Sequence, residues 1–264
     1  YGFSNLTDLL RIKELITKIN NSRKHTYPFV ICGAGPTGVE LACKLSDLFD
    51  NRFAIYLIDK GSEILAKSKS FNREKAINAI SERNIKICLE HQIEYVDKTF
   101  LEISSSDSEI NKSLKINYSA LILTAGLNPF QSKLILNFLG KNNKIKVNNF
   151  LQINAYENIF FVGDITFSET NPFPSSAQVA MQQGFLVAQN IISLRKGKKP
   201  KSFEFEDFGE MLSLGIGNAS ITGYGITLAG PLAFEIRRLA YLTRMPGLSQ
   251  SLKSSVSWLF SKKI

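Results

Sequence analysis

Apolar residues recur at helical spacing along residues 5–20, and this spacing predicts an amphipathic helix. After a polar connector, an apolar run leads into a glycine-rich turn and a second helical segment, PFVICGAGPTGVELACKLSDLF. A further buried strand with an acidic residue at its end follows in RFAIYLIDKG. Strand, glycine loop, helix and strand in this order predict a βαβ unit with parallel strands.

The pattern changes between residues 93 and 118, where short apolar segments alternate with polar turns and predict an antiparallel meander. Buried strands are predicted again in SALIL and in NIFFVGDI, the second of which ends in Gly163 and Asp164. Residues 174–195 have the pattern of one long helix. After a charged linker, a glycine-rich stretch leads to two short amphipathic helices. The chain is therefore predicted to be an α/β protein.

Three glycines with the spacing G-x-G-x-x-G occupy the turn between the first strand and its helix. Gly33 permits the tight turn, Gly35 lets a diphosphate approach the backbone, and Gly38 lets the helix pack close to the strand. The helix N-terminus then offers free N–H groups to the phosphates. Asp59 ends the second strand, where a carboxylate accepts hydrogen bonds from ribose hydroxyls. We predict a dinucleotide site that prefers NAD over NADP, although the neighbouring Lys60 weakens that preference.

Two further acidic positions have open interpretations. Glu40 lies in the first turn of the glycine-loop helix, where it either favours the helix dipole or contacts the ligand. Gly163 and Asp164 end a strand, where a glycine lets a ligand lie close and a carboxylate can bind a polyol. A turn followed by an acid that favours a helix dipole would give the same two residues.

The start of the long helix reads PSSAQVAMQQGF, which places Gln178 and Gln182 on one face because they are four residues apart. Uncharged amides at this place either satisfy buried backbone groups or face a neutral polar ligand. The local sequence does not choose between these two interpretations.

The net charge of +9 is concentrated toward the C-terminus, because residues 195–264 hold 11 Lys and Arg against 5 Asp and Glu. A basic end predicts an anionic partner, either nucleic acid or a membrane surface. No nucleic-acid-binding motif is present, whereas the last helix has an apolar stripe, formed by Leu248, Leu252, Val256, Leu259 and Phe260. We predict that this region lies on an anionic membrane surface. The alternatives are a solvated face of a packed helix and a contact in a homodimer.

The sequence contains three cysteines, Cys32, Cys43 and Cys88, without a C-x-x-C pair. Their spacing argues against a disulfide framework, a zinc site and a redox-active dithiol, so no metal site is predicted and a reducing compartment is favoured. No run of about 18 apolar residues and no signal peptide is visible. These features predict a peripheral protein at the cytoplasmic face of a membrane.

Taken in order, these motifs resemble the flavoproteins with two dinucleotide-binding domains, and most of all the type II NADH:quinone oxidoreductases. The shared features are the glycine loop with its following acid, the meander, and the segments LTAG, IFFVGD and AQVAMQQG. The resemblance covers nearly the whole chain. The glycine loop and the Gly-Asp pair are common to the superfamily, whereas A-Q-x-x-x-Q followed by an amphipathic C-terminus is more typical of the type II enzymes. LTAG departs mildly from the family, which often has Ala-Thr-Gly there.

The resemblance implies that FAD and NADH are the cofactors, and it assigns roles to the matching positions. NADH is expected to bind at Gly33, Gly35, Gly38, Glu40 and Asp59, with Glu40 near the nicotinamide end. FAD is expected at Gly163, Asp164 and Ala177, and near Gly126, where the chain crosses between domains. The reaction is expected at Ala177, Gln178 and Gln182, with both glutamines lining a quinone pocket.

The resemblance also implies a Rossmann-like NAD-binding domain with an antiparallel β-meander, a partial FAD-binding domain and an amphipathic helical C-terminus. The glycine loop for the FAD adenosine diphosphate is expected upstream, so the chain is interpreted as the C-terminal two-thirds of such an enzyme, unable alone to hold FAD tightly. We expect four segments. Residues 1–25 form a helix that follows the first FAD-binding segment, and residues 26–128 form the NAD-binding domain. Residues 129–202 form the returning part of the FAD-binding domain, and residues 203–264 form a membrane-associating region.

The activity that the resemblance implies is electron transfer from NADH to a membrane quinone through the flavin, without proton pumping. A soluble FAD- and NAD(P)-dependent reductase of the same superfamily is one alternative, and a non-catalytic NAD-binding, redox-sensing module is another. Binding to anionic liposomes separates the quinone reductase from the soluble enzyme, and NADH binding without turnover indicates the module.

Overall fold

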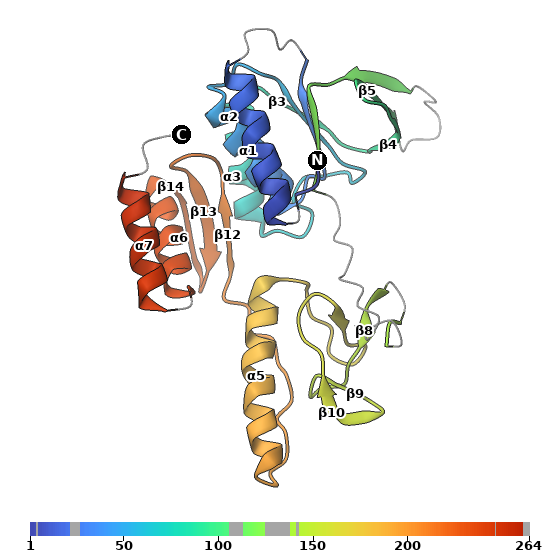
Figure 1. The fold of residues 1–264 in the computed structure, drawn as a ribbon, viewed down its shortest axis with the longest axis vertical. Coiled ribbons are helices and arrows are strands. Elements are labelled where there is room, and N and C mark those ends of the chain that lie inside the picture. The colour runs from blue at the N-terminus through green and yellow to red at the C-terminus, as the bar shows by residue number, and fades with distance from the viewer. Residues whose placement is uncertain are drawn as a thin grey trace. The chain divides into compact units, whose positions relative to one another are not determined.

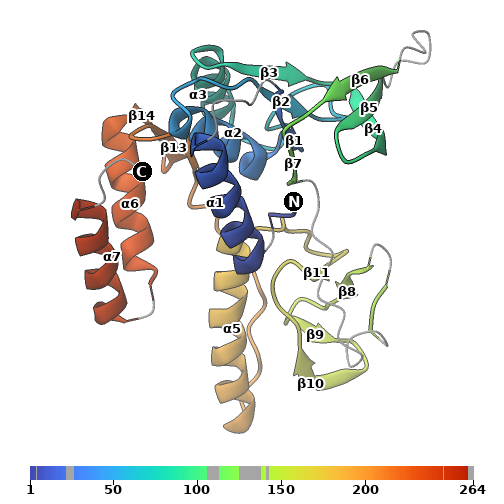
Figure 2. The same cartoon turned by 45° about the horizontal axis from the view of Figure 1, so that its top comes forward.

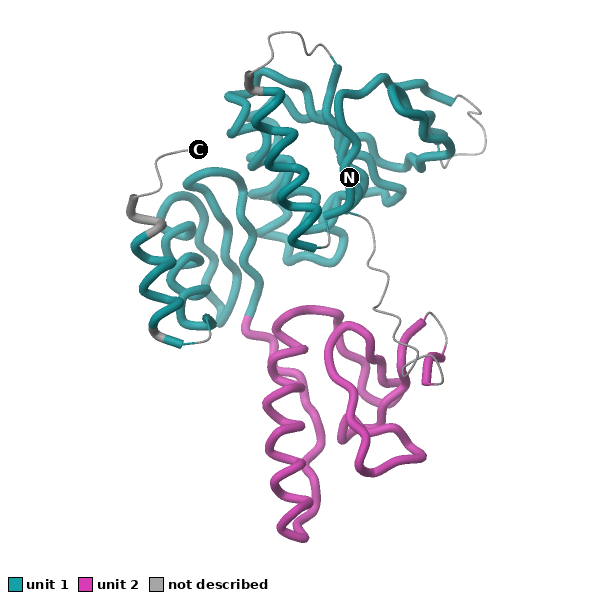
Figure 3. The backbone as a smooth tube through the Cα atoms, viewed as in Figure 1, with its two compact units in different colours: residues 1–126, 209–264 teal, residues 127–208 magenta. Residues whose placement is uncertain are grey.

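The computed structural model divides the chain into two compact units (Figure 3). Unit 1 comprises residues 1–126 and 209–264, and unit 2 comprises residues 127–208. The residues that the structure describes are 1–3, 5–21, 27–105, 113–124, 138–140, 143–245 and 247–260. The assignment of cofactor-binding roles to the four segments expected from the sequence stays a prediction.

A parallel sheet forms the centre of unit 1. Its strands lie in the order β3-β2-β1-β7, all parallel, and they are Ile85–Cys88, Ile55–Ile58, Phe29–Cys32 and Ala120–Leu123. The burial of these strands is nearly continuous along β1 and β2, as expected for strands covered on both faces. The βαβ unit predicted from the order of apolar runs is confirmed.

Three helices cover one face of this sheet (Figure 2). They are α1, Leu6–Asn21, α2, Pro36–Leu48, and α3, Ser70–Ser81. Side chains alternate along each strand, so Phe29 and Ile31 of β1 enter the core under the helices. Ile12 of α1 belongs to the same core and is 2% exposed, which explains why the N-terminal amphipathic helix packs here.

The meander covers the opposite face. It consists of the antiparallel strands β4, His91–Val96, β5, Phe100–Ser105, and β6, Leu114–Asn117, as the sequence predicted. Val30, the residue of β1 that points away from the helices, lies in a second core with Leu101 and Ile103 of β5.

Residues 210–260 add a further part to unit 1, here called the C-terminal layer. Three antiparallel strands, β12 Glu210–Ser213, β13 Ala219–Gly223 and β14 Ile226–Gly230, precede the helices α6 Pro231–Thr243 and α7 Leu248–Phe260. Figures 1 and 2 show α6 and α7 side by side. The helices were predicted, whereas the glycine-rich stretch gave no prediction of a sheet. Leu212 and Leu214 join the core under α1, α2 and α3, so this layer belongs to unit 1.

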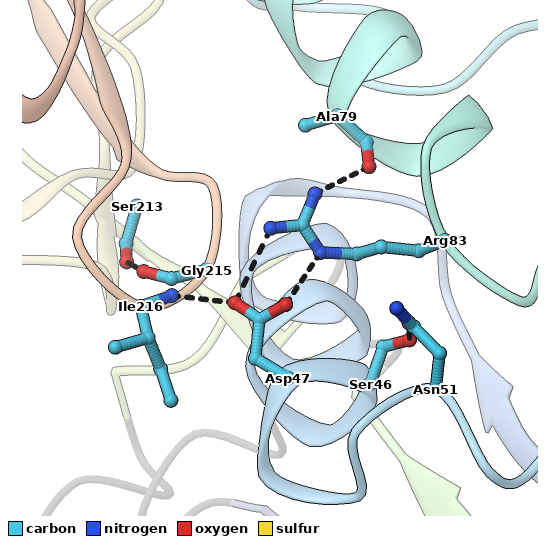
Figure 4. Close-up of polar contacts among 8 residues, drawn as sticks. All are labelled: Ser46, Asp47, Asn51, Ala79, Arg83, Ser213, Gly215 and Ile216. Carbon is cyan, nitrogen blue, oxygen red and sulfur yellow. Dashed lines mark hydrogen bonds and ion pairs between the residues drawn. The ribbon is translucent and has the colours of Figure 1, made fainter. Parts of the chain in front are cut away.

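A buried ion pair joins α2, α3 and the turn after β12 (Figure 4). Arg83 donates from Nε to Asp47 Oδ1 at 2.8 Å and from Nη2 to Oδ2 at 3.2 Å. The backbone N–H of Ile216 donates to the same Oδ2 at 2.6 Å. Gly215 has a φ of +111°, and a Cβ there would lie 2.2 Å from Asp47 Oδ2. The turn therefore requires glycine at this position.

Unit 2 is built on the helix α5, Ala177–Arg195, whose N-cap hydroxyl on Ser176 accepts from the N–H of Val179 at 3.2 Å. The short strands β8 Ile145–Lys146, β9 Gln152–Ile153, β10 Tyr156–Phe160 and β11 Thr166–Phe167 accompany it. Val179 and Val187 face a core with Leu151 and Phe203. The helix predicted over 174–195 is confirmed from residue 177 onward.

The prediction of a buried strand at 158–165 was wrong in its burial and its extent. The strand β10 ends at Phe160, and its first three residues are exposed. Within the described residues β10 pairs only with β9. A two-stranded ribbon leaves much of its surface uncovered, so the apolar run did not indicate a central strand here.

Candidate functional site

The glycine loop has the geometry that its spacing predicted. Gly33 has a φ of +112°, a conformation that favours glycine, and its N–H donates to Ile58 O at 2.8 Å. A Cβ on Gly38 would lie 1.8 Å from Gly33 O, so only glycine lets α2 approach the loop this closely. A Cβ on Gly35 would meet nothing within 4 Å, which leaves the backbone open to a ligand. The three glycines therefore have three different roles, and Gly35 marks the open side.

The carboxylate of Asp59 lies against the glycine loop. Its Oδ2 accepts from the N–H of Ala34 at 2.6 Å, and its Oδ1 accepts from Gly61 at 2.7 Å. These contacts fix the carboxylate at the end of β2, where a ribose hydroxyl could still donate to its remaining lone pairs. The ribose contact itself stays a prediction. Burial, and then the Asp59 charge, raise the pKa of the nearby Cys32 thiol.

Thr124 also contacts the glycine loop, although the sequence did not predict it as a site residue. It follows β7, and its hydroxyl donates to Cys32 O at 2.9 Å and to Gly33 O at 3.2 Å. It therefore joins the end of β7 to the start of the glycine loop. A hydroxyl residue directly after a buried strand, in the segment LTAG, was the available signal. Gly126 of the same segment lies outside the described residues.

Glu40 contacts the C-terminal layer. Its Oε1 accepts from the N–H of Ser213 at 2.7 Å and from Arg237 Nη2 at 3.2 Å. Burial raises the pKa of Glu40, although the Ser213 N–H and the Arg237 charge oppose the shift. The residue thus joins α2 to β12 and α6, and its predicted place near the nicotinamide is untested.

In unit 2, Gly163 and Asp164 lie in a tight turn between β10 and β11. Gly163 has a φ of +82°, and its N–H donates to Gln183 Oε1 at 2.7 Å. Gln183 is fully buried, and its Nε2 has no hydrogen-bond partner among the described residues. Asp164 is exposed. Gln183 was not among the predicted site residues, because a single glutamine beside two others gave no distinct signal.

The amides of the other two glutamines meet the backbone of the segment after α5. Gln182 donates from Nε2 to Glu206 O at 2.8 Å and accepts from the N–H of Glu206 at 3.1 Å. Gln178 accepts from the N–H of Phe208 at 2.8 Å. These contacts agree with the interpretation in which the glutamine amides satisfy backbone groups. Ala177, the first residue of α5, is exposed.

The structure thus gathers the predicted site residues into two groups, one in each compact unit. Unit 1 holds the glycine loop, Asp59 and Glu40, and unit 2 holds the turn at Gly163 and the start of α5. The described residues contain no group of three or more His, Cys, Asp and Glu side chains that could hold a metal ion.

A parallel sheet with a glycine-rich turn, helices on one face and a meander on the other defines a dinucleotide-binding α/β protein. The chain belongs to the pyridine nucleotide-disulphide oxidoreductase family, whose sequence model matches residues 4–184.

Two curated relatives and one solved structure are informative. The chain is 32% identical to demethylphylloquinone reductase NdbB of Synechocystis over 98% of its length and 64% of the relative. It is 29% identical to type II NADH:quinone oxidoreductase of Staphylococcus aureus over 77% of its length and 52% of the relative. The structure of NDH2 from Plasmodium falciparum in complex with NADH superposes with a TM-score of 0.84 at 16% identity, over 100% of this chain and 74% of that one. This last likeness shows a shared fold. The chain spans less than two thirds of the length of both curated relatives, and the predicted resemblance to the type II enzymes is confirmed by their names.

Proposed function

We propose that this chain is part of a flavoprotein that passes electrons from NADH to a quinone. One observation carries the proposal: the similarity to a relative named demethylphylloquinone reductase extends over 98% of the chain at 32% identity. The aligned length includes the glycine loop of unit 1 and the turn at Gly163 in unit 2, so both groups of site residues fall within it.

In this proposal, unit 1 binds NADH through the glycine loop. The open surface at Gly35 and the N-terminus of α2 suit a diphosphate, because backbone N–H groups and the helix dipole point toward it. Asp59, held by two backbone N–H groups, accepts from the ribose hydroxyls. Glu40 lies near the nicotinamide end.

Unit 2 fits part of an FAD site. The left-handed Gly163 has only Ala180 Cβ, at 3.6 Å, beside the position of a Cβ, and the exposed Asp164 follows it. Behind this turn, the buried Nε2 of Gln183 makes no hydrogen bond with any described residue. Asp164 would hold the ribityl and phosphate portion, and Ala177 would lie at the ring, while Gly126 would lie near both cofactors. When bound, FAD supplies a two-electron acceptor between NADH and quinone.

The proposed quinone pocket lies at the start of α5. Gln178 and Gln182 border it, with their amides held by the backbone of residues 206–208. An amide suits a quinone carbonyl, because it can donate a hydrogen bond without the burial of a charge.

We further propose that the protein works at the cytoplasmic face of a membrane, where a lipid-soluble quinone is available. Among the described residues, no helix is both long and apolar enough to cross a bilayer. The helices α6 and α7 instead offer exposed apolar side chains for an interfacial contact, among them Leu232, Leu239, Leu252 and Val256. A homodimer contact through the same helices is the alternative use of this surface.

The test is steady-state turnover of the full-length gene product with NADH and a short-chain quinone. We expect quinone-dependent NADH oxidation that disappears when the flavin is removed and returns when FAD is added back. The variant Gly35→Val serves as a control, because a side chain on the open side of the loop should prevent NADH binding. An intact, flavin-loaded protein that reduces no quinone would sink the proposal.

A non-catalytic NAD-binding module is the second candidate. It is favoured by the glutamine amides, which already have backbone partners and need no ligand. This candidate predicts NADH binding without turnover in the same experiment.

A further inference from the structure

An open cavity of about 730 Å³ lies at the surface of unit 1, between α2 and the C-terminal layer. Its volume is in the range of small-molecule sites. One wall is a face of α2, where Glu40, Leu41, Lys44 and Leu48 recur at helical spacing. The facing wall comes from the turn 213–217 and from α6. None of the glycines of the dinucleotide loop lines the cavity, and neither does Asp59. Glu40 is the one residue that the cavity shares with the proposed NADH site.

The cations of this cavity are only partly paired. Glu40 is the one carboxylate that lines it, and its partner is Arg237 at 3.2 Å. Arg238 pairs with Glu235 at 2.9 Å. Lys44 is an exposed side chain that makes no ion pair or hydrogen bond with any described residue. Its partial burial lowers its pKa, and Asp47 opposes the shift.

Not every N–H group of the Arg237 guanidinium has a hydrogen-bond partner in the part of the protein that the structure describes. Its Nη2 donates to Glu40, whereas its Nη1 makes no hydrogen bond with any described residue. A guanidinium N–H without a protein partner can donate to a ligand oxygen. Lys44 and Arg237 together therefore offer charge-assisted donors that the protein itself does not satisfy.

The rest of the lining is largely apolar. Leu41, Leu48, Ile216 and Phe234 surround the polar groups, and Phe3 closes one side. A site with unsatisfied cations and an apolar wall suits a molecule with an anionic head and a hydrocarbon body. We propose that this cavity binds an anionic amphiphile, whose carboxylate or phosphate head meets Lys44 and Arg237 and whose apolar body lies against α2 and Phe234. This site goes beyond the proposed NADH and quinone sites.

The test is calorimetric titration of the full-length protein with monododecyl phosphate below its micelle concentration. We expect saturable binding to the wild type, and about tenfold weaker binding to Lys44→Gln, because one charge-assisted contact is lost. The matched control is Lys98→Gln, which removes the same charge from an exposed turn between β4 and β5 and should bind as the wild type does. NADH binding and the unfolding midpoint, measured on the same samples, should not change, so the result is independent of the proposed redox function.

Two further arms decide the source of the head group and the specificity. If Lys44→Gln also weakens binding to vesicles that contain phosphatidylglycerol, the amphiphile is a bilayer lipid. If it weakens only the binding of the monomeric phosphate, the amphiphile is a free molecule, and either result supports the proposal. Three outcomes overturn it: no saturable binding by the wild type, equal binding by Lys44→Gln, or equally tight binding of uncharged dodecanol.

Discussion

Gly35 and Gly38 are three residues apart, but a methyl group would meet different surroundings at the two positions. At Gly38 it would lie 1.8 Å from Gly33 O, so Gly38→Ala forces α2 away from the loop. We expect it to lower the free energy of unfolding by about 1–3 kcal/mol or more and to abolish NADH binding. Urea unfolding and NADH fluorescence titration measure both effects.

The matched variant is Gly35→Ala, where the methyl group points into open space and the backbone φ of −73° suits alanine. Stability should change by no more than about 0.5 kcal/mol. The affinity for NADH should still fall by about tenfold, because the methyl group occupies the approach of the diphosphate. If Gly35→Ala destabilises the protein as much as Gly38→Ala, the two roles assigned here are wrong.

Glu40 gives a pH dependence with a definite sign. Burial raises its pKa above the ordinary value of 4.5, although Ser213 and Arg237 oppose the shift. The folded protein therefore holds this proton more tightly than the unfolded chain, so the stabilisation is complete below pH 4.5 and is lost as pH rises through the raised pKa. Relative to Glu40→Gln, the wild type should lose stability over that window. A stability difference that stays constant with pH would contradict this.

At the scale of elements, three structural segments depend on one carboxylate. Asp47 of α2 binds Arg83, which follows the C-cap of α3, and the turn after β12 (Figure 4). The side chains of Asp47 and Arg83 are only 17% and 11% exposed. Asp47→Ala leaves a buried cation without its partner, so we expect a loss of about 3–5 kcal/mol of unfolding free energy. Hydrogen exchange at residues 213–217 should become faster in this variant.

The ion pair between Arg73 and Glu63 provides the control, since Glu63 is 48% exposed. Glu63→Ala should cost less than about 1 kcal/mol, because water screens the pair. Similar losses from the two substitutions would mean that burial does not set the strength of the Asp47 contact.

A second prediction at this scale concerns the two clamps on α5. Gln182 makes two hydrogen bonds to the backbone of Glu206, so Gln182→Ala should lower the free energy of unfolding by about 1–3 kcal/mol. Because the same residue borders the proposed quinone pocket, KM for the quinone should rise while KM for NADH stays the same.

The control is Asn190 on the same helix, which clamps the backbone of Lys201 with two bonds of 2.9 and 2.8 Å. Asn190→Ala should destabilise the protein and leave both KM values unchanged. An unchanged quinone KM in Gln182→Ala would remove the ligand role and leave only the clamp.

At the scale of the whole molecule, the positive charge and the exposed apolar residues meet in the C-terminal layer. Arg244 caps α6 and Lys253 belongs to α7, and the same two helices carry Leu239, Leu252 and Val256, which are 61%, 65% and 53% exposed. We expect the protein to sediment with phosphatidylglycerol vesicles and to be released by about 0.5 M salt, which screens charges at a surface.

The double variant Arg244→Gln/Lys253→Gln should weaken this binding by about thirtyfold, since each cation near the surface contributes about 1 kcal/mol. The double variant Lys75→Gln/Lys86→Gln removes the same charge from α3 and β3 and should bind normally. Equal binding to neutral phosphatidylcholine vesicles would argue against an electrostatic contact.

Much of unit 1 could be predicted because its signals are local. The nearly continuous apolar runs of β1 and β2, the spacing of the three glycines and the helical period of α2 each lie within a few consecutive residues. Such patterns reflect backbone geometry and burial, which the chain imposes on itself over one or two turns. The apolar pattern predicted burial wrongly at β10, because that strand is not covered on both faces.

The partners of the site residues could not be predicted, because they come from distant segments. Glu40 meets Ser213 and Arg237, and Asp47 meets Ile216. Glu40, near the start of α2, would suit the helix dipole equally well, whereas Asp47 lies in the last turn, where the dipole disfavours an acid. Only the packing of the C-terminal layer assigns the two acids their partners.

The sequence by itself determined the dinucleotide loop, the parallel sheet with its meander and the helix that begins AQVAMQQG, since each follows from residue types at fixed local spacing. Only the tertiary structure decided that the C-terminal layer packs into the core of unit 1, that the glutamine amides hold residues 206–208, and that Lys44 and Arg237 face one cavity. The physical reason is that a polar side chain takes whichever partner the folded chain places within about 3 Å of it, and that partner can lie anywhere in the sequence.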